Sequence, residues 1–109
     1  MDLKEQKAET EEVFAEIAKH EAMPAAACIN FQFVVDGKNP DWDAFTEAAE
    51  AAGYTVEWYD ADEEDEACLE ITTAEEPLSV ENLWAHEERL TLMGAIHGFA
   101  ADGWGFFTE

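Results

Sequence analysis

The sequence predicts an α+β fold of the ferredoxin-like split type, with an antiparallel sheet of four strands and two helices on one face. Several short segments alternate apolar and polar residues, as strands with one buried face do. Two longer segments between them carry helix start and stop signals. The resulting order is strand–helix–strand–strand–helix–strand. We therefore expect one globular α+β domain over residues 27–109, preceded by an N-terminal helix within residues 1–24.

The spacing of apolar residues predicts the first two elements, a helix and then a strand. Residues 3–21 predict a helix with a thin apolar stripe, which comprises Leu3, Val13, Phe14, Ile17 and Ala18. Pro24 then marks a break. Residues 27–35 predict a strand, with Ile29, Phe31, Phe33 and Val35 on its buried face.

The next helix begins at Asn39-Pro40-Asp41, where Asn39 can accept from free backbone amides and Pro40 suits the first turn. Its inner side comprises Trp42, Phe45, Ala48, Ala49 and Ala52. Gly53 is placed to end it. Strands over 54–59 and 68–72 follow, joined by an acidic hairpin tip at residues 60–66.

Ser79 is a plausible N-cap for the second covering helix, which is expected to run to His97 and stop at Gly98. Its inner face comprises Val80, Leu83, Trp84, Leu90 and Met93. Residues 101–109 predict a closing aromatic strand. The uncovered face of the sheet would display Asn30, Gln32, Thr55, Glu57, Tyr59, Glu70 and Thr72. The N-terminal helix could cover part of this face or pack at an edge.

The charge limits what the protein can bind. The chain of 109 residues has 27 Asp and Glu against five Lys and Arg, for a formal net charge of −22. Aromatic residues make up 12% of it, so the chain has enough apolar surface to fold despite self-repulsion. Such a field repels nucleic acid and anionic membranes and attracts basic partners. With no long apolar run and no signal region, we expect a cytoplasmic protein without membrane contact.

The chemistry-bearing residues form no recognisable catalytic or metal-binding pattern. The run at 60–66 fails the calcium-loop pattern, because its sixth and twelfth positions hold Asp65 and Ile71. His86 and His97 lie about 16 Å apart along a helix, too far to share a metal. No nucleophile elbow or phosphate-binding loop is present. We expect no enzymatic activity, no catalytic residues, no cofactor and no metal.

A short motif near the end of the chain carries a family resemblance. Asp102-Gly103-Trp104-Gly105 follows a helix and enters an aromatic strand, and Glu50-Ala51-Ala52-Gly53-Tyr54 ends the earlier helix. Together with the element order, these segments resemble the regulator of ribonuclease activity B family over roughly residues 27 to 108. The resemblance implies an acidic, non-enzymatic protein that binds ribonuclease E and inhibits RNA cleavage.

We interpret the motif itself as mainly structural: Gly103 and Gly105 would allow positive φ or close backbone approach at a tight turn between helix and strand. Trp104 would fill the core. A surface that binds a partner is the minority interpretation of the same residues.

The first functional hypothesis is a regulator that docks on a basic protein segment, of ribonuclease E or a similar nuclease, without touching nucleic acid itself. The expected partner-binding residues are Glu57, Tyr59, Asp60, Asp62, Glu63, Glu64, Asp65, Glu66 and Glu70. An alternative is a small-ligand-binding or catalytic domain with a pocket near Trp58, Trp84 and Trp104. A third is self-association through the open face or an edge strand, so we expect a monomer or a weak homodimer.

Overall fold

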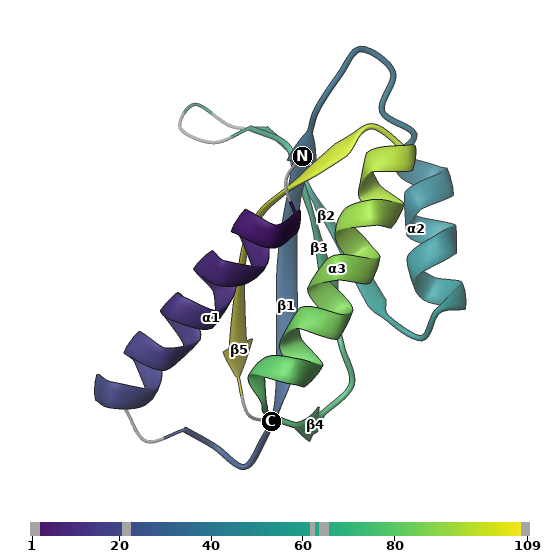
Figure 1. Cartoon of the computed structure of the whole chain (residues 1–109). Helices are drawn as coiled ribbons and strands as arrows, with labels where there is room; N and C mark the ends of the chain where they lie inside the picture. Colours follow the sequence, from purple (N-terminus) through teal and green to yellow (C-terminus); the bar gives the residue numbers. More distant parts are fainter. Residues whose placement is uncertain (1–2, 21–22, 62, 64–65, 108–109) are drawn as a thin grey trace.

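A computed structural model describes residues 3–20, 23–61, 63 and 66–107. Within this part of the chain it has three helices on one face of a five-stranded antiparallel sheet (Figure 1). The helices are α1 (Leu3–His20), α2 (Trp42–Ala51) and α3 (Val80–Ile96). The strands are β1 (Ala26–Val35), β2 (Thr55–Tyr59), β3 (Cys68–Thr72), β4 (Glu76–Pro77) and β5 (Phe99–Phe107).

β1 is the central strand of the sheet. It pairs with β3 along one side and with β5 along the other, and β2 pairs with the far side of β3. The mixed α+β class and the antiparallel sheet are thus confirmed. The expected count of four strands missed β4, which pairs with the first two residues of β1 in a register shifted by one residue from that of β3.

The apolar alternation of β1 places Ile29, Phe31 and Phe33 in the core, beneath the helices. Residues from the other elements complete it: Phe45, Ala49, Tyr54, Leu69, Ile71, Leu83, Leu90 and Phe99. α2 packs on β2, and α3 packs on β5 and β1. Val35, expected on the buried face, is partly exposed at the end of its strand.

The helix ends follow the capping signals with one difference. Asp41, not Asn39, is the N-cap of α2, and its carboxylate accepts from the backbone N–H of Ala44 at 3.0 Å. Ser79 caps α3 as predicted, accepting from Asn82 N–H at 3.1 Å. The predicted stops Gly53 and Gly98 both have positive φ, of 98° and 87°.

The position of α1, which the sequence left open, is beside α3 on the helix-covered side of the sheet, so the opposite face stays uncovered (Figure 1). Its inward face uses only part of the apolar stripe we expected, because Phe14 packs against the core. Thr10 is its buried residue, whereas Val13 is 47% exposed. α1 therefore docks partly through polar side chains.

Candidate functional site

The uncovered face of the sheet brings two of the predicted partner-binding residues directly together. Glu57 on β2 lies opposite Glu70 on β3, and Glu70 lies opposite Gln32 on β1. Adjacent carboxylates on one face repel each other, which disfavours the free protein and favours a cation bound between them. This row is therefore suited to a Lys or Arg side chain from a partner.

Tyr59 extends the same row towards the hairpin. Its hydroxyl donates to Glu57 Oε2 at 2.7 Å. That hydrogen bond, followed by the charge of Glu70, raises the pKa of Tyr59 to about 12. Because Tyr59 itself is 44% exposed, the carboxylates beside it make an exposed negative field, not a buried one.

The hairpin continues this surface beyond the strand ends. Asp60, Glu63 and Glu66 are exposed, whereas Asp62, Glu64 and Asp65 lie outside the described residues. We use the name acidic face for the described carboxylates and the tyrosine of this region, namely Glu57, Tyr59, Asp60, Glu63, Glu66 and Glu70. The chain has five Lys and Arg residues, and none lies between Thr55 and Thr72. The acidic face therefore lacks any cation supplied by its own segment.

The 102–105 motif lies inside β5, not at a turn between helix and strand as predicted. Gly103 pairs with Gln32 and Ala101 with Phe33, so Asp102 is the extra residue of a β-bulge. Neither Gly103 nor Gly105 has positive φ, so that part of the prediction is wrong. Close approach does apply at Gly105, where a Cβ would come within 3.0 Å of Asn30 Oδ1.

Trp104 is only half-buried, so it does not fill the core as expected but packs against its edge. It pairs with Phe31 on the helix-covered side and stacks on Phe106, with ring centroids 6.5 Å apart. There it forms one wall of a groove between α1, α3 and β5, with a volume of about 570 Å³.

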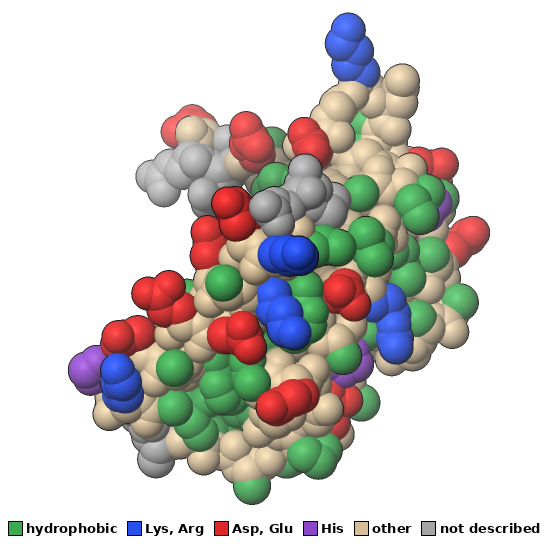
Figure 2. Space-filling view, viewed as in Figure 1, with side chains coloured by type: hydrophobic (Ala, Val, Ile, Leu, Met, Phe, Trp, Pro, Cys, Tyr) green, Lys and Arg blue, Asp and Glu red, His purple; other side chains and the backbone are tan. Residues whose placement is uncertain are grey.

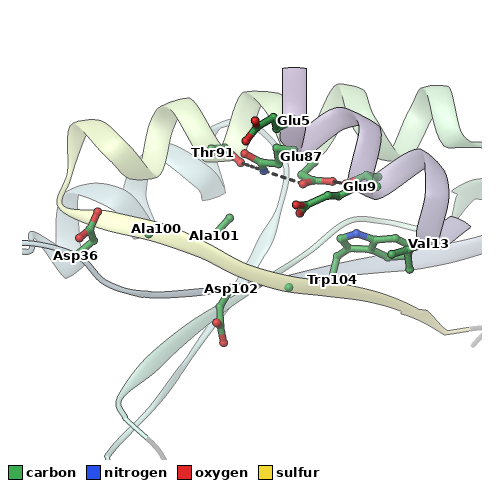
Figure 3. Close-up of a pocket in the computed structure, with 13 residues that line it drawn as sticks. Glu5, Glu9, Val13, Asp36, Glu87, Thr91, Ala100, Ala101, Asp102 and Trp104 are labelled. Carbon is green, nitrogen blue, oxygen red and sulfur yellow. Dashed lines mark hydrogen bonds between the residues drawn. The ribbon is translucent and has the colours of Figure 1, made fainter. Parts of the chain in front are cut away.

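Figure 3 shows Glu5 and Glu9 of α1 and Glu87 of α3 at this groove, above Ala100 and Ala101 of β5. Val13 and Trp104 lie close together at one end, while Asp102 points away below the strand. Figure 2 shows that carboxylates are also frequent along α1 on this side of the molecule. The groove combines acidic, small and aromatic linings.

A buried polar network closes the inner wall of this groove. Glu87 is 6% exposed, and its two oxygens accept from Thr10 Oγ1 at 2.6 Å and Gln6 Nε2 at 2.7 Å. Gln6 also donates to Thr91 Oγ1 at 3.0 Å. Because these bonds join α1 to α3, we interpret Glu87 as a residue that fixes α1. No sequence pattern distinguishes Glu87, since it is one Glu among many.

A second network surrounds His86 on the other side of α3. Its Nε2 lies 2.6 Å from Glu76 Oε1, and its Nδ1 lies 2.6 Å from the Tyr54 hydroxyl, which also accepts from Arg89 at 3.3 Å. Burial is the main cause that raises the pKa of Tyr54. Tyr54 is 6% exposed, whereas the side chains of His86 and Glu76 are 20% and 29% exposed. This carboxylate–imidazole–phenol chain ties β4 to α3 and the start of β2.

The tryptophans of the alternative hypothesis do not share a pocket. Trp104 lines the groove beside α1, Trp58 lines a separate notch with Trp42, and Trp84 is buried on α3. Among the described residues, no three His, Cys, Asp or Glu side chains are grouped so that they could hold a metal ion. None of the described helices is long and apolar enough to cross a membrane.

Comparison with known protein families gives a match over most of the chain. The family model for regulator of ribonuclease activity B matches residues 7–106. The matched range runs from α1 into β5, so it includes the acidic face, the 102–105 motif and most of the groove. No curated protein matches the chain.

Proposed function

The chain belongs to the regulator of ribonuclease activity B family, and from this we propose that it regulates RNA cleavage by binding a ribonuclease directly, with ribonuclease E as the expected partner. The family match over 7–106 is the observation that carries this proposal. Regulation of a ribonuclease can act on the enzyme or on its substrate. The net charge of −22 favours the enzyme, because a strongly acidic protein repels RNA.

The acidic face supplies the mechanism. A ribonuclease holds the phosphate backbone with Lys and Arg side chains, and those side chains are also the natural partners of carboxylates. Glu57 and Glu70 lie side by side, so one cation between them would relieve their mutual repulsion. A basic segment bound to the acidic face would then be unavailable to RNA.

The rest of the molecule serves as a scaffold in this proposal. The strand order β5–β1–β3–β2 supports a ferredoxin-like split sandwich, which leaves one sheet face open to a partner. We expect the protein to act in the cytoplasm, without catalysis of its own and without a cofactor. Its polar open face favours a monomer or a weak homodimer over a large dry interface.

The test combines binding with RNA cleavage. Purified protein is titrated against ribonuclease E at low and at moderate salt, and cleavage of a structured RNA is followed in parallel. We expect direct binding that weakens with salt, and inhibition that excess RNA relieves. Inhibition without any complex between the two proteins, or binding of the regulator to the RNA alone, would contradict the proposal.

A further inference from the structure

A half-exposed tryptophan lies next to the acidic face. Trp58 is 51% exposed, at the end of β2, and lines a notch of about 430 Å³ between that strand and the start of α2. The aromatic lining is completed by Trp42 and Tyr59. Three carboxylates also line the notch, those of Asp41, Asp43 and Asp60. Aromatic rings surrounded by carboxylates are the typical lining of a site for an organic cation.

The rings are held in place without a ligand. Trp58 Nε1 donates to Thr46 Oγ1 at 2.8 Å, and its ring centroid lies 5.5 Å from that of Trp42. Trp42 in turn meets Phe99 edge-on, with centroids 5.0 Å apart. The open part of the Trp58 ring is therefore fixed, so little further entropy is lost when a ligand stacks on it.

The three carboxylates that line the notch have different roles. Asp41 caps α2 through its bond to Ala44 N–H, and so offsets the positive end of the helix dipole. Asp43 and Asp60 are both exposed and lie on the two sides of the notch, at the start of α2 and just after β2. The charge of these carboxylates exceeds the half charge of a helix N-terminus, so the notch favours cations.

We propose that this notch binds an arginine side chain of the basic segment that docks on the acidic face. The proposal rests on the function proposed above and names one contact within it. Trp58 pairs with the core residue Leu69, so its ring lies on the helix-covered side of β2, opposite to Glu57 and Glu70. Tyr59 and Asp60 belong both to the notch and to the acidic face, so one extended segment that passes round the edge strand β2 can reach both. Arginine fits better than lysine, because a planar guanidinium stacks on an indole ring while it donates to a carboxylate.

A peptide titration tests the notch directly. The probe is acetyl-Gly-Arg-Gly-Arg-Gly-amide, added to ¹⁵N-labelled protein at low salt, with the corresponding lysine and citrulline peptides as comparisons. We expect the indole N–H signal of Trp58 to shift with the arginine peptide, less with lysine, and not with uncharged citrulline. Equal shifts for arginine and citrulline, or shifts confined to other residues, would overturn the proposal.

Variants separate the notch from general charge attraction. Trp58→Ala should weaken arginine-peptide binding about 5- to 10-fold, and Asp43→Asn about 2- to 5-fold. The matched controls are Trp104→Phe, in the groove beside α1, and Glu47→Gln, an exposed carboxylate of α2 that does not line the notch. Both should bind as the unchanged protein does. The thermal midpoint of each variant shows whether it is folded.

The same variants distinguish the two proposals when ribonuclease E is the ligand. Salt-sensitive binding by the unchanged protein that survives Trp58→Ala and Asp43→Asn would reject the notch and leave the proposed function intact. An absence of binding by the unchanged protein would reject the proposed function. In that case the arginine-peptide titration would still test whether the notch binds a guanidinium, which would then come from some other basic segment.

Discussion

Thr10 of α1 and Glu87 of α3 are joined by a buried hydrogen bond, 2.6 Å between Thr10 Oγ1 and Glu87 Oε1. Thr10 is 3% exposed and Glu87 6% exposed, so the bond is shielded from water. A charged acceptor strengthens such a bond, and a lost partner leaves a buried carboxylate oxygen unsatisfied. The docking of α1 therefore uses this buried polar bond together with the apolar contact of Phe14 with the core.

Thr10→Val should lower the free energy of unfolding by about 1–3 kcal/mol, because it keeps the side-chain shape but removes the donor to Glu87. The measurement is chemical denaturation, repeated for Glu87→Gln and for the double variant. We expect the double variant to lose less than the sum of the single ones, since both remove one interaction. Simple additivity would show that the two residues act separately.

Gly98→Ala should destabilise the protein by about 1–2 kcal/mol or more. Gly98 has φ of 87°, and a Cβ there would meet Pro40 Cα at 2.9 Å. Gly103→Ala is the matched control, because Gly103 lacks positive φ and a Cβ there meets nothing within 4 Å. Thermal unfolding of both variants checks this. Equal losses would mean that neither the positive φ of Gly98 nor its close approach to Pro40 decides the effect.

Glu70→Gln should raise stability by about 0.2–1 kcal/mol, because it removes one of two like charges that face each other across β2 and β3. The gain should be larger at low salt than at about 0.5 M salt, where screening already relieves the repulsion. The same reasoning predicts that the unchanged protein becomes more stable as salt is added. A thermal midpoint that falls with salt would contradict both expectations.

The main strands could be predicted from the sequence because alternation directly encodes a sheet with one buried face, as Phe31 and Phe33 show. β4 could not, since it has only two residues and includes Pro77. The glycines of the 102–105 motif suggest a turn, but the motif lies inside β5. The bulge at Asp102 depends on pairing with β1, which no local pattern reveals.

The same limit applies to the candidate site: the sequence predicts which face of the sheet a residue lies on, but not which residues of other elements it contacts. Glu57 and Glu70 were predicted on one face, because alternation assigns faces, but their direct opposition needed the register of β2 and β3. Trp42 at the start of α2 contacts Trp58 near the end of β2, and a local sequence pattern does not predict such a contact between two elements. Glu87 was missed because its burial is set by the docking of α1. Tertiary contacts, and not residue types, carry this information.

Tyr59 should titrate near pH 12, and Glu57→Gln should bring its pKa down towards the ordinary value of 10.0. Both causes named for the raised pKa, the bond to Glu57 and the charge of Glu70, favour the protonated phenol. The native state thus keeps this proton at a higher pH than the unfolded chain does. Any stability it contributes is present below pH 10.0 and is lost as the pH rises towards about 12.

Ultraviolet difference absorbance of tyrosinate measures this titration. The chain has two tyrosines, so Tyr59→Phe identifies which transition belongs to Tyr54. Glu50→Gln, an exposed carboxylate at the end of α2, serves as the control for a general change of charge. A Tyr59 transition that is unmoved by Glu57→Gln would show that the hydrogen bond does not persist in solution.

Neutralising the hairpin should slow the association with a basic partner more than it speeds dissociation. The variant replaces Asp60 by Asn and Glu63 and Glu66 by Gln, all exposed and on the acidic face. Exposed charges steer a partner over long distances, so their loss lowers the association rate, with the larger effect at low salt. Stopped-flow binding to ribonuclease E, or to a basic peptide, at two salt concentrations gives both rates.

The control carries the same change of net charge elsewhere, with Gln in place of the exposed Glu11, Glu12 and Glu88 on α1 and α3. If position matters, this variant should associate faster than the hairpin variant. Equal slowing of the two would mean that net charge alone steers the partner, and that the acidic face is not the docking surface. Unchanged rates in both would remove long-range steering by these charges from the mechanism, and the contacts of Glu57 and Glu70 on the open sheet face would remain to be tested.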